Sequence, residues 1–306
     1  MKPKTTRADL HIYSRHSERA ADWVLRRLDF PASYSDPKDL YSALRGAGMD
    51  FVTITDQNTI SGCLEIAHLP GVFLGEEVSA HFPDDECRIH ILTWGITEAQ
   101  HRTIQEARKN IFDLQEYLCA ENIAHSVAHP FHSVNGKLTA LHLQKLILLF
   151  RHFEGVNGRY CQLLSQTAQS VLGGLTPRDI EIFSSRTGLA PTHDEAWKKI
   201  FTGGSDDHGG THAGSAYTET DMSASVEDFL ENIREGRCHA GELTGRALKS
   251  FQPSLRFSKT EARDPRLAGA DGQYTLAAFD EAHRNASTRP ARAGPIGTFW
   301  CGDWRR

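Results

Sequence analysis

Short apolar runs alternate with helical patterns along most of the chain. Seven such runs are short, end near turn residues and predict strands, at residues 8–14, 51–55, 71–78, 88–95, 123–128, 152–156 and 201–205. Apolar residues spaced by three and four predict the helices between them. The expected helices are residues 17–28, 37–47, one continuous helix from Thr97 through Leu118, 138–150, a helix opened by Thr176-Pro177, and 225–234.

This alternation predicts an α/β fold in which parallel strands are covered by helices. In barrels built this way, the active site lies at the C-terminal ends of the strands. Histidine and acidic residues recur at the ends of the predicted strands. They are His11, Asp56, Glu77, His90, His129, Asp206 and His208.

Composition predicts a soluble, globular protein, with 39% hydrophobic and 24% charged residues among 306. The net charge of −5 disfavours broad binding of nucleic acid by charge alone. No apolar run has membrane-spanning length, and the polar start of the chain contains no signal-peptide pattern. The six cysteines show no CxxC spacing, which favours reduced thiols in a cytoplasmic protein.

The pattern changes from about Thr244, where Arg, Ala, Gly, Pro and Ser replace the regular periodicity. We therefore expect one domain at residues 5–245 and a C-terminal tail at 246–306 that is irregular or loosely docked.

Imidazole and carboxylate groups together suit divalent transition metals such as Zn, Mn or Fe. A carboxylate such as Glu77 can bridge two ions, and two ions can hold a phosphoester while generating a hydroxide nucleophile. The chain has no Walker phosphate loop and no GxSxG motif for a nucleophilic serine. The residues therefore favour metal-assisted hydrolysis over nucleophilic-serine chemistry.

Five ordered blocks resemble the polymerase and histidinol phosphatase (PHP) superfamily of metal-dependent phosphoesterases. The blocks are ADLHIYS, TITDQNT, GEEVS, HIL followed later by AHP, and GSDDH, over residues 7–241. Three further segments resemble sequences of PHP proteins associated with glycosyltransferases, namely DWVLRR, GMDFVTITD and HSVAHP. The resemblance implies a distorted (β/α)7 barrel with up to three metal ions at its C-terminal face.

The resemblance also implies a ligand set. His11 matches the first His of an HxH block, and Glu77 matches the carboxylate that bridges two ions. His90 and His129 match ligands of the second metal, Asp206 matches a ligand of the first, and His208 matches a ligand of the third. Asp56 is a further metal candidate, although orienting a neighbour or capping a helix is an equal alternative.

Two positions depart from the family pattern, because Tyr13 and Gln57 stand where imidazoles are expected. A phenol and a carboxamide are weaker ligands than imidazole. The second site therefore looks complete and the first lacks one nitrogen, so about two ions are expected. For Tyr13 we weigh a weak ligand, a proton donor and a plug that fills the missing site. Gln57 is interpreted as holding a bound water.

The leading hypothesis is hydrolysis of a small phosphomonoester or nucleotide by metal-activated hydroxide, with His208 or Tyr13 protonating the leaving oxygen. Asp206 completes the predicted catalytic set. The candidates for substrate binding are Arg15, Gln57, Asn157 and Arg159.

Two alternatives belong to other classes. The loss of two imidazoles favours a metal-binding regulatory or scaffold domain with little turnover. The family also allows a nuclease acting on DNA or RNA ends, but the acidic chain makes nucleic acid a less favoured partner than a small phosphorylated substrate. We expect no membrane partner. The resemblance to glycosyltransferase-associated PHP proteins also suggests a glycosyltransferase-linked context.

Overall fold

The computed structural model describes residues 5–17, 33, 35–159 and 162–243. The strands in these residues are β1 (Thr5–Ala8), β2 (Gly75–His81), β3 (Arg88–Trp94), β4 (Ala124–Val127), β5 (His152–Asn157), β6 (Ile200–Gly204), β7 (Ala216–Asp221) and β8 (Cys238–Glu242). The helices are α2 (Pro37–Gly46), α3 (Ser61–Ile66), α4 (Glu98–Ala107), α5 (Ile111–Ala120), α6 (Ala140–Leu149), α7 (Gln162–Gly173), α8 (Pro177–Thr187) and α9 (Val226–Arg234). The helix expected at 17–28 and the tail expected at 246–306 lie outside the described residues.

The strands form two sheets. One has the order β1-β7-β8 and is antiparallel, and the other has the order β2-β3-β4-β5-β6. Within the larger sheet, β4, β5 and β6 are parallel, but β2, β3 and β4 pair in antiparallel fashion. The prediction of parallel strands throughout was therefore wrong for β2 and β3. Residues 82–87 join them, and a connection this short cannot make a parallel crossover.

The described strands do not close into one barrel ladder. The two sheets meet where β6 lies against β7 and β8, and the Gly203 amide donates to Thr218 Oγ1 at 2.9 Å. Single bridges pair Ile12 with Asp207 and Gln57 with Glu77. The α/β class is confirmed. The candidate site lies close to the place where the two sheets meet.

Several predicted boundaries are correct because local signals fix them. α2 begins after Asp36, whose side chain accepts from the Lys38 amide, and Pro37 takes the first helical turn. α8 likewise begins after Thr176, and α9 begins after Ser225. All three helices were predicted from the sequence, and Thr176-Pro177 was the start signal used for α8.

The single helix expected from Thr97 through Leu118 is two helices. Asn110 adopts an extended backbone and its side chain accepts from the Phe112 amide, which starts α5. The apolar spacing continues across this break because Ile104 and Leu114 both face the same core. The apolar spacing indicates which face of a helix is buried, and it does not indicate that the helix is interrupted at Asn110.

Two predicted strands also differ. Residues 51–55 are not a strand and hold one bridge from Val52 to Val72. The strand predicted at 8–14 ends at Ala8, so His11 lies on the segment that follows β1. β7 and β8 were not predicted.

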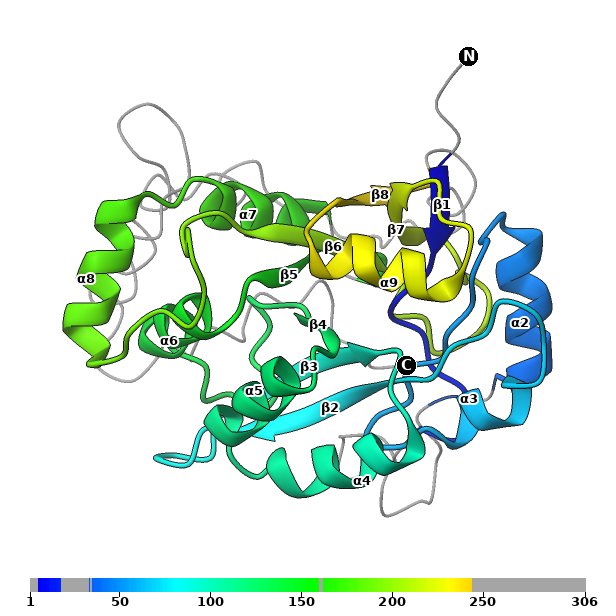
Figure 1. Cartoon of the computed structure of the whole chain (residues 1–306), viewed down its shortest axis with the longest axis horizontal. Coiled ribbons are helices and arrows are strands. Elements are labelled where there is room, and N and C mark those ends of the chain that lie inside the picture. The colour runs from blue at the N-terminus through cyan, green and yellow to red at the C-terminus, as the bar shows by residue number, and fades with distance from the viewer. Residues whose placement is uncertain (1–4, 18–32, 34, 160–161, 244–306) are drawn as a thin grey trace, which may run out of the picture.

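Several helices pack against the larger sheet, whereas α2 and α3 pack against each other (Figure 1). α5 contacts β2, α7 contacts β5, and α9 contacts both β4 and β7. The main buried cluster includes Val78, Ile91, Leu146 and Phe153 and fills the space between this sheet and its helices. Among the described helices, none is both long and apolar enough to cross a membrane.

Candidate metal centre

His11 is held by its own backbone segment and by β6. The buried carboxylate of Asp9 accepts from the amides of His11, Ser205 and Gly214 at 3.2, 2.9 and 2.9 Å. Burial raises the pKa of the Asp9 carboxyl to about 6. Asp9 therefore fastens the segment after β1 to the end of β6, and its side chain is not part of the metal cluster.

The close approach of these segments requires a glycine on β6. A Cβ on Gly204 would lie 2.3 Å from His11 Cβ. The next turn returns Asp206 to the same place, because the Asp206 amide donates to the His11 carbonyl at 2.6 Å. Asp206 has a φ of 51°, a left-handed conformation that aspartate tolerates better than most residues.

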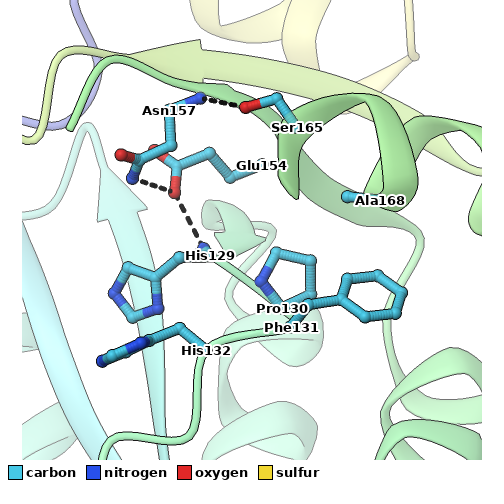
Figure 2. Close-up of a pocket in the computed structure, with 8 residues that line it drawn as sticks. All are labelled: His129, Pro130, Phe131, His132, Glu154, Asn157, Ser165 and Ala168. Carbon is cyan, nitrogen blue, oxygen red and sulfur yellow. Dashed lines mark hydrogen bonds between the residues drawn. The ribbon is translucent and has the colours of Figure 1, made fainter. Parts of the chain in front are cut away.

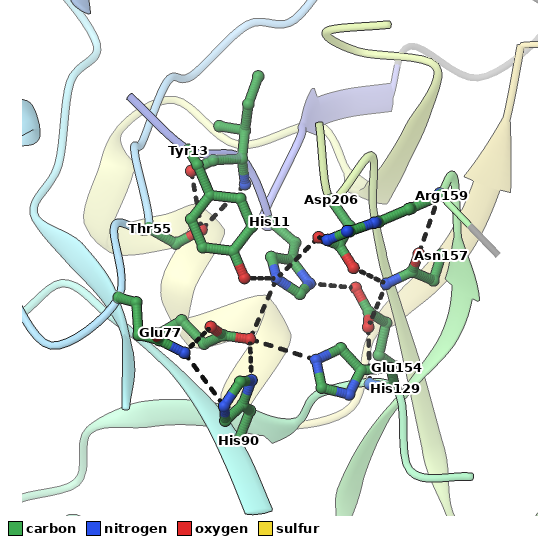
Figure 3. A network of polar contacts seen from close by, with 12 residues as sticks. His11, Tyr13, Thr55, Glu77, His90, His129, Glu154, Asn157, Arg159 and Asp206 are labelled. Atoms are coloured by element: carbon green, nitrogen blue, oxygen red, sulfur yellow. Dashed lines mark hydrogen bonds and ion pairs between the residues drawn. The ribbon is translucent and has the colours of Figure 1, made fainter. Parts of the chain in front are cut away.

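Glu77 lies at the centre of three imidazoles (Figure 3). Its Oε1 is 2.7 Å from His90 Nδ1, 3.2 Å from His129 Nε2 and 3.4 Å from His11 Nε2. Burial opposes ionisation, but His90 and hydrogen bonds from His11 and His129 hold the pKa of the Glu77 carboxyl well below its usual range. Glu77 is therefore an anionic carboxylate surrounded by nitrogen donors.

Asp206 also faces Nε2 of His11. Its Oδ2 accepts from Asn157 Nδ2 at 3.0 Å, and its Oδ1 is buried without a hydrogen-bond donor among the described residues. Oδ1 is 3.9 Å from His11 Nε2 and 3.6 Å from the Arg159 guanidinium. Although burial opposes ionisation, His11 and Arg159 lower the pKa of the Asp206 carboxyl to about 2. An anionic oxygen without a donor is what a cation site offers.

Two sets of ligand atoms are compact enough for a metal ion. One is His11, His129 and Asp206, and the other is Glu77, His90 and His129, with the ligand atoms of each set within 4.8 Å of one another. All five side chains are buried. Nitrogen and carboxylate ligands suit divalent transition metals. The structure thus brings together five of the predicted metal ligands, with His129 common to both sets.

His208 and Asp56 stand apart from these sets. The ring of His208 is 4.1 Å from that of Tyr13, and its Nδ1 is 3.6 Å from Asp206 Oδ1, so it lies beside the cluster. Asp56 accepts from the amide and the hydroxyl of Ser14, both at 2.6 Å. Burial raises the pKa of the Asp56 carboxyl to about 6. This arrangement corresponds to the alternative in which Asp56 orients a neighbour.

Tyr13 and Gln57, the two positions where the resemblance implies imidazoles, point into the cluster. Tyr13 Oη is 2.8 Å from His11 Nε2, the nitrogen that faces Asp206. Burial and the nearby carboxylates raise the pKa of the Tyr13 phenol well above its usual range. Gln57 Nε2 is 3.3 Å from Glu77 Oε2 and 3.1 Å from His90 Nε2. Both side chains therefore lie next to candidate ligands, and a phenol or a carboxamide binds a metal more weakly than an imidazole does.

Among the predicted substrate residues, Arg159 and Asn157 lie at the cluster and Arg15 does not. The guanidinium of Arg159 is 3.3 Å from His208 Nε2 and its side chain is 55% exposed. Arg15 instead pairs with Asp36 and Glu65 at the surface. Arg159 therefore contacts the buried Asp206 carboxylate and is itself exposed to solvent.

Sequence reasoning missed Glu154, which lies in the middle of β5. Its side chain is buried and contacts His11, His129 and Asn157 (Figures 2 and 3). The available signal was an acidic residue inside an otherwise buried strand, HFEGVN. Glu154 also lines a small pocket beside the cluster together with Phe131 and His132, which lie on the segment after β4, and burial lowers the pKa of His132 to about 3.

Comparison with known proteins identifies part of the chain. Residues 195–238 match a family model described as PHP-associated, a segment that contains Asp206 and His208. The uncharacterized protein MJ1587 of Methanocaldococcus jannaschii is 38% identical over 72 residues, which cover 24% of this chain and 40% of that protein. The aligned segment therefore spans less than half of this curated relative.

Solved structures with a related arrangement are distant. A two-domain protein from Bacteroides vulgatus containing a predicted PHP-like metal-dependent phosphoesterase is 14% identical, with a TM-score of 0.48, and the match covers 78% of this chain and 65% of that one. The lesion-specific endonuclease PfuEndoQ from Pyrococcus furiosus is 13% identical, with a TM-score of 0.47, and the match covers 78% of this chain and 58% of that one. The PHP-associated match agrees with the resemblance of the GSDDH block.

Proposed function

We propose that this protein is a metal-dependent phosphoesterase of the PHP type that hydrolyses a small phosphomonoester. The observation that supports it best is the pair of buried ligand sets that share His129, with Glu77 contacting all three imidazoles. His11, His129 and Asp206, and Glu77, His90 and His129, would each hold a divalent ion. Such an ion would supply charge neutralisation at phosphoryl oxygens and a water of lowered pKa.

The surrounding residues have roles that follow from their positions. Arg159 is exposed on one side and faces Asp206 on the other, so its guanidinium can hold a phosphate oxygen that enters from solvent. His208 lies between Arg159 and the Tyr13 ring and is the proposed proton donor to the leaving oxygen. Asn157 fixes the orientation of Asp206 through its amide.

The first experiment combines elemental analysis of the purified protein with phosphate release from a panel of small phosphoesters. We expect about two equivalents of metal and turnover that a chelator abolishes. Asp206→Asn should remove most of the turnover, since it removes an anionic ligand. No phosphate release from any ester after addition of Mn²⁺ or Zn²⁺ would exclude the proposal.

Arg159 provides a test of phosphate recognition with a matched control. Arg159→Ala should raise KM because a charge-assisted hydrogen bond to phosphate is lost, at roughly 1.5–3 kcal/mol or about ten- to a hundredfold. Arg15→Ala should leave KM unchanged, because Arg15 pairs with Asp36 and Glu65 away from the cluster. Equal effects of the two variants would contradict the role of Arg159.

A monoesterase is favoured over a nuclease because the chain carries a net charge of −5. Cleavage of a short oligonucleotide in Mn²⁺, without hydrolysis of monoesters, would reverse this preference. The cytoplasmic location and the glycosyltransferase-linked context stay predictions from the sequence.

A second function is favoured by one observation. Tyr13 Oη lies 2.8 Å from His11 Nε2, the nitrogen that would bind a metal. This contact supports a metal-binding regulatory domain with little turnover. In that case the double variant Tyr13→His and Gln57→His should gain hydrolysis from a low starting value. Strong hydrolysis by the unaltered protein would exclude this alternative.

A further inference from the structure

Glu154 is a buried carboxylate that three separate parts of the site share. It lies on β5 with 2% of its surface exposed. His11 Nδ1 is 2.8 Å from its Oε1, while the His129 amide and Asn157 Nδ2 donate to its Oε2 at 2.8 and 2.9 Å. Figure 3 shows the carboxylate between these groups, on the far side of His11 from Tyr13.

The number of donors requires a group that only accepts. Three N–H groups converge on two oxygens, and an ionised carboxylate is the side chain that offers acceptors alone. A glutamine of the same shape has one oxygen and one NH₂, so at least one donor would face another donor. A buried donor that loses its acceptor costs about 1–3 kcal/mol.

These contacts determine how the neighbouring ligands are presented. Since Nδ1 of His11 donates to Glu154, its Nε2 is the nitrogen turned toward Glu77 and Asp206, at 3.4 and 3.9 Å. His129 has a φ of 28°, and its amide is held by Glu154 while its Nε2 lies 3.2 Å from Glu77 Oε1.

Asn157 extends the same network to the third ligand. Its Nδ2 donates to Glu154 Oε2 at 2.9 Å and to Asp206 Oδ2 at 3.0 Å. Asp206 Oδ1 is thereby left as the oxygen without a donor among the described residues. Glu154 therefore contacts two members of the set His11, His129 and Asp206 and reaches the third through one amide.

We propose that Glu154 is a positioning residue that presents Nε2 of His11 and orients the His11–His129–Asp206 set for a divalent ion. This inference rests on the metal centre of the proposed function. It adds that the two sets depend unequally on Glu154, because Glu77 and His90 have no hydrogen bond to it in the described structure.

The test compares Glu154→Gln with a matched control, Glu76→Gln. Glu76 is also a fully buried glutamate bonded to a histidine and an amide, since His101 Nδ1 and Gln105 Nε2 lie 2.9 and 2.8 Å from its oxygens. Both variants lose one buried carboxylate, but only Glu154 contacts the ligand sets.

The measurement is calorimetric and spectroscopic titration of each metal-free protein with Co²⁺. In Glu154→Gln, we expect one of the two equivalents to bind about ten- to a hundredfold more weakly, with a changed visible spectrum. Glu76→Gln should keep both affinities and the spectrum. Unchanged binding in Glu154→Gln, or the same loss in both variants, would overturn the proposal.

A second measurement needs no carboxylate variant and therefore survives a folding failure. In the Zn²⁺-loaded protein labelled with ¹⁵N-histidine, His11 is assigned by comparison with His11→Gln. We expect its Nδ1 to be protonated and its Nε2 to be metal-bound. Coordination through Nδ1 would overturn the proposal whatever the variants do.

Neither readout depends on turnover. If the protein hydrolyses no phosphoester but the nitrogen assignment and the Co²⁺ result hold, the function fails and the role of Glu154 stands. Turnover combined with Nδ1 coordination would support the function and overturn the role of Glu154. Glu154→Asp, which keeps an acceptor-only carboxylate, should lose less affinity than Glu154→Gln.

Discussion

Tyr13 and Gln57 stand where the resemblance to PHP proteins implies imidazoles, and each directs a polar atom at a candidate metal ligand. The Tyr13 hydroxyl meets His11 Nε2, and the Gln57 amide meets both Glu77 and His90. At these distances Tyr13 and Gln57 hydrogen-bond to candidate ligands in the metal-free protein, and these contacts would have to rearrange if a metal ion bound there. We therefore expect each side chain to stabilise the metal-free cluster and to weaken metal binding.

Tyr13→Phe separates these two effects. Loss of the hydroxyl should destabilise the metal-free protein by about 1–3 kcal/mol, because His11 Nε2 loses a buried partner. The same change should tighten Zn²⁺ binding by roughly five- to tenfold, since a hydrogen bond worth about 1 kcal/mol no longer has to be broken. Urea unfolding and calorimetric titration measure the two quantities.

Tyr41→Phe is the matched control for this change. The Tyr41 hydroxyl donates to the Pro70 carbonyl at the surface, at 3.1 Å. We expect a small loss of stability and no change in Zn²⁺ affinity. Weaker Zn²⁺ binding by Tyr13→Phe would instead identify the phenol as a ligand.

Strand order and helix caps were predictable to different degrees from the sequence. Asp36, Thr176 and Ser225 are local signals, and the helices they start were found. The antiparallel pairing of β2 and β3 and the break at Asn110 depend on connections that hydrophobic spacing does not encode. The alternation of strand and helix patterns therefore predicted the α/β class but did not predict which strands pair or in which direction.

The candidate site divides in the same way. The five clustered ligands were found because strand-end His and acidic residues matched family blocks. Glu154 was missed because the buried acidic residue in HFEGVN does not by itself indicate that its partner is His11, which lies 143 positions earlier on the segment after β1. Arg15 was placed near the site by sequence proximity, but Asp36 and Glu65 direct it elsewhere.

The contact between β6 and the segment after β1 makes a prediction about Gly204. In Gly204→Ala, the new methyl group would lie 2.3 Å from His11 Cβ, so the two segments must separate. Overpacking of this kind costs about 1–3 kcal/mol. We expect that loss of stability together with weaker metal binding, because His11 and Asp206 are joined across this contact.

Gly46→Ala is the control for the added methyl group. Gly46 is the last residue of α2, and a Cβ there has no atom within 4 Å. Alanine should stabilise the helix by about 0.5–1 kcal/mol and leave metal binding unchanged. Thermal unfolding and metal titration of both variants distinguish steric separation from a general effect of alanine.

Two neutral histidines away from the metal cluster contribute to the response of the protein to acid. Burial lowers the pKa of His152 to about 3, and partial burial beside Lys199 lowers the pKa of His193 to about 3. The folded protein therefore keeps them neutral, while the unfolded chain takes up protons below a pH of about 6.5. Their contribution to stability is complete above that pH and is lost as the pH falls toward 3.

His152→Gln tests this prediction. His152 Nε2 is 2.7 Å from the Ile233 carbonyl, and glutamine can still donate there. Between pH 6.5 and 4.5 the variant should lose less stability than the unaltered protein, by up to about 1.4 kcal/mol per pH unit. Urea unfolding at several pH values measures the difference, and identical slopes would show that His152 does not titrate on unfolding.

The five clustered ligands connect both sheets. Glu77 and His90 belong to β2 and β3 of the larger sheet, whereas His11 follows β1 of the smaller sheet. Among the described strands, the two sheets share no continuous ladder. Isolated backbone contacts, such as that of the Asp206 amide with the His11 carbonyl at 2.6 Å, are the backbone links between the His11 segment and the end of β6. A bound ion would add a link between Glu77 or His90 and His11, and its effect on stability should reach beyond its immediate neighbours.

We expect Zn²⁺ at one hundred times its dissociation constant to raise the free energy of unfolding by about 2.7 kcal/mol. Amide hydrogen exchange should slow in β1 and β7 as well as in β2 and β3, because His11 carries the constraint to the smaller sheet. In Glu154→Gln, protection should persist in β2 and β3, which supply Glu77 and His90, and fall in β1 and β7. Protection confined to the larger sheet in the unaltered protein would show that the ion does not engage His11, and that the two sheets are stabilised independently.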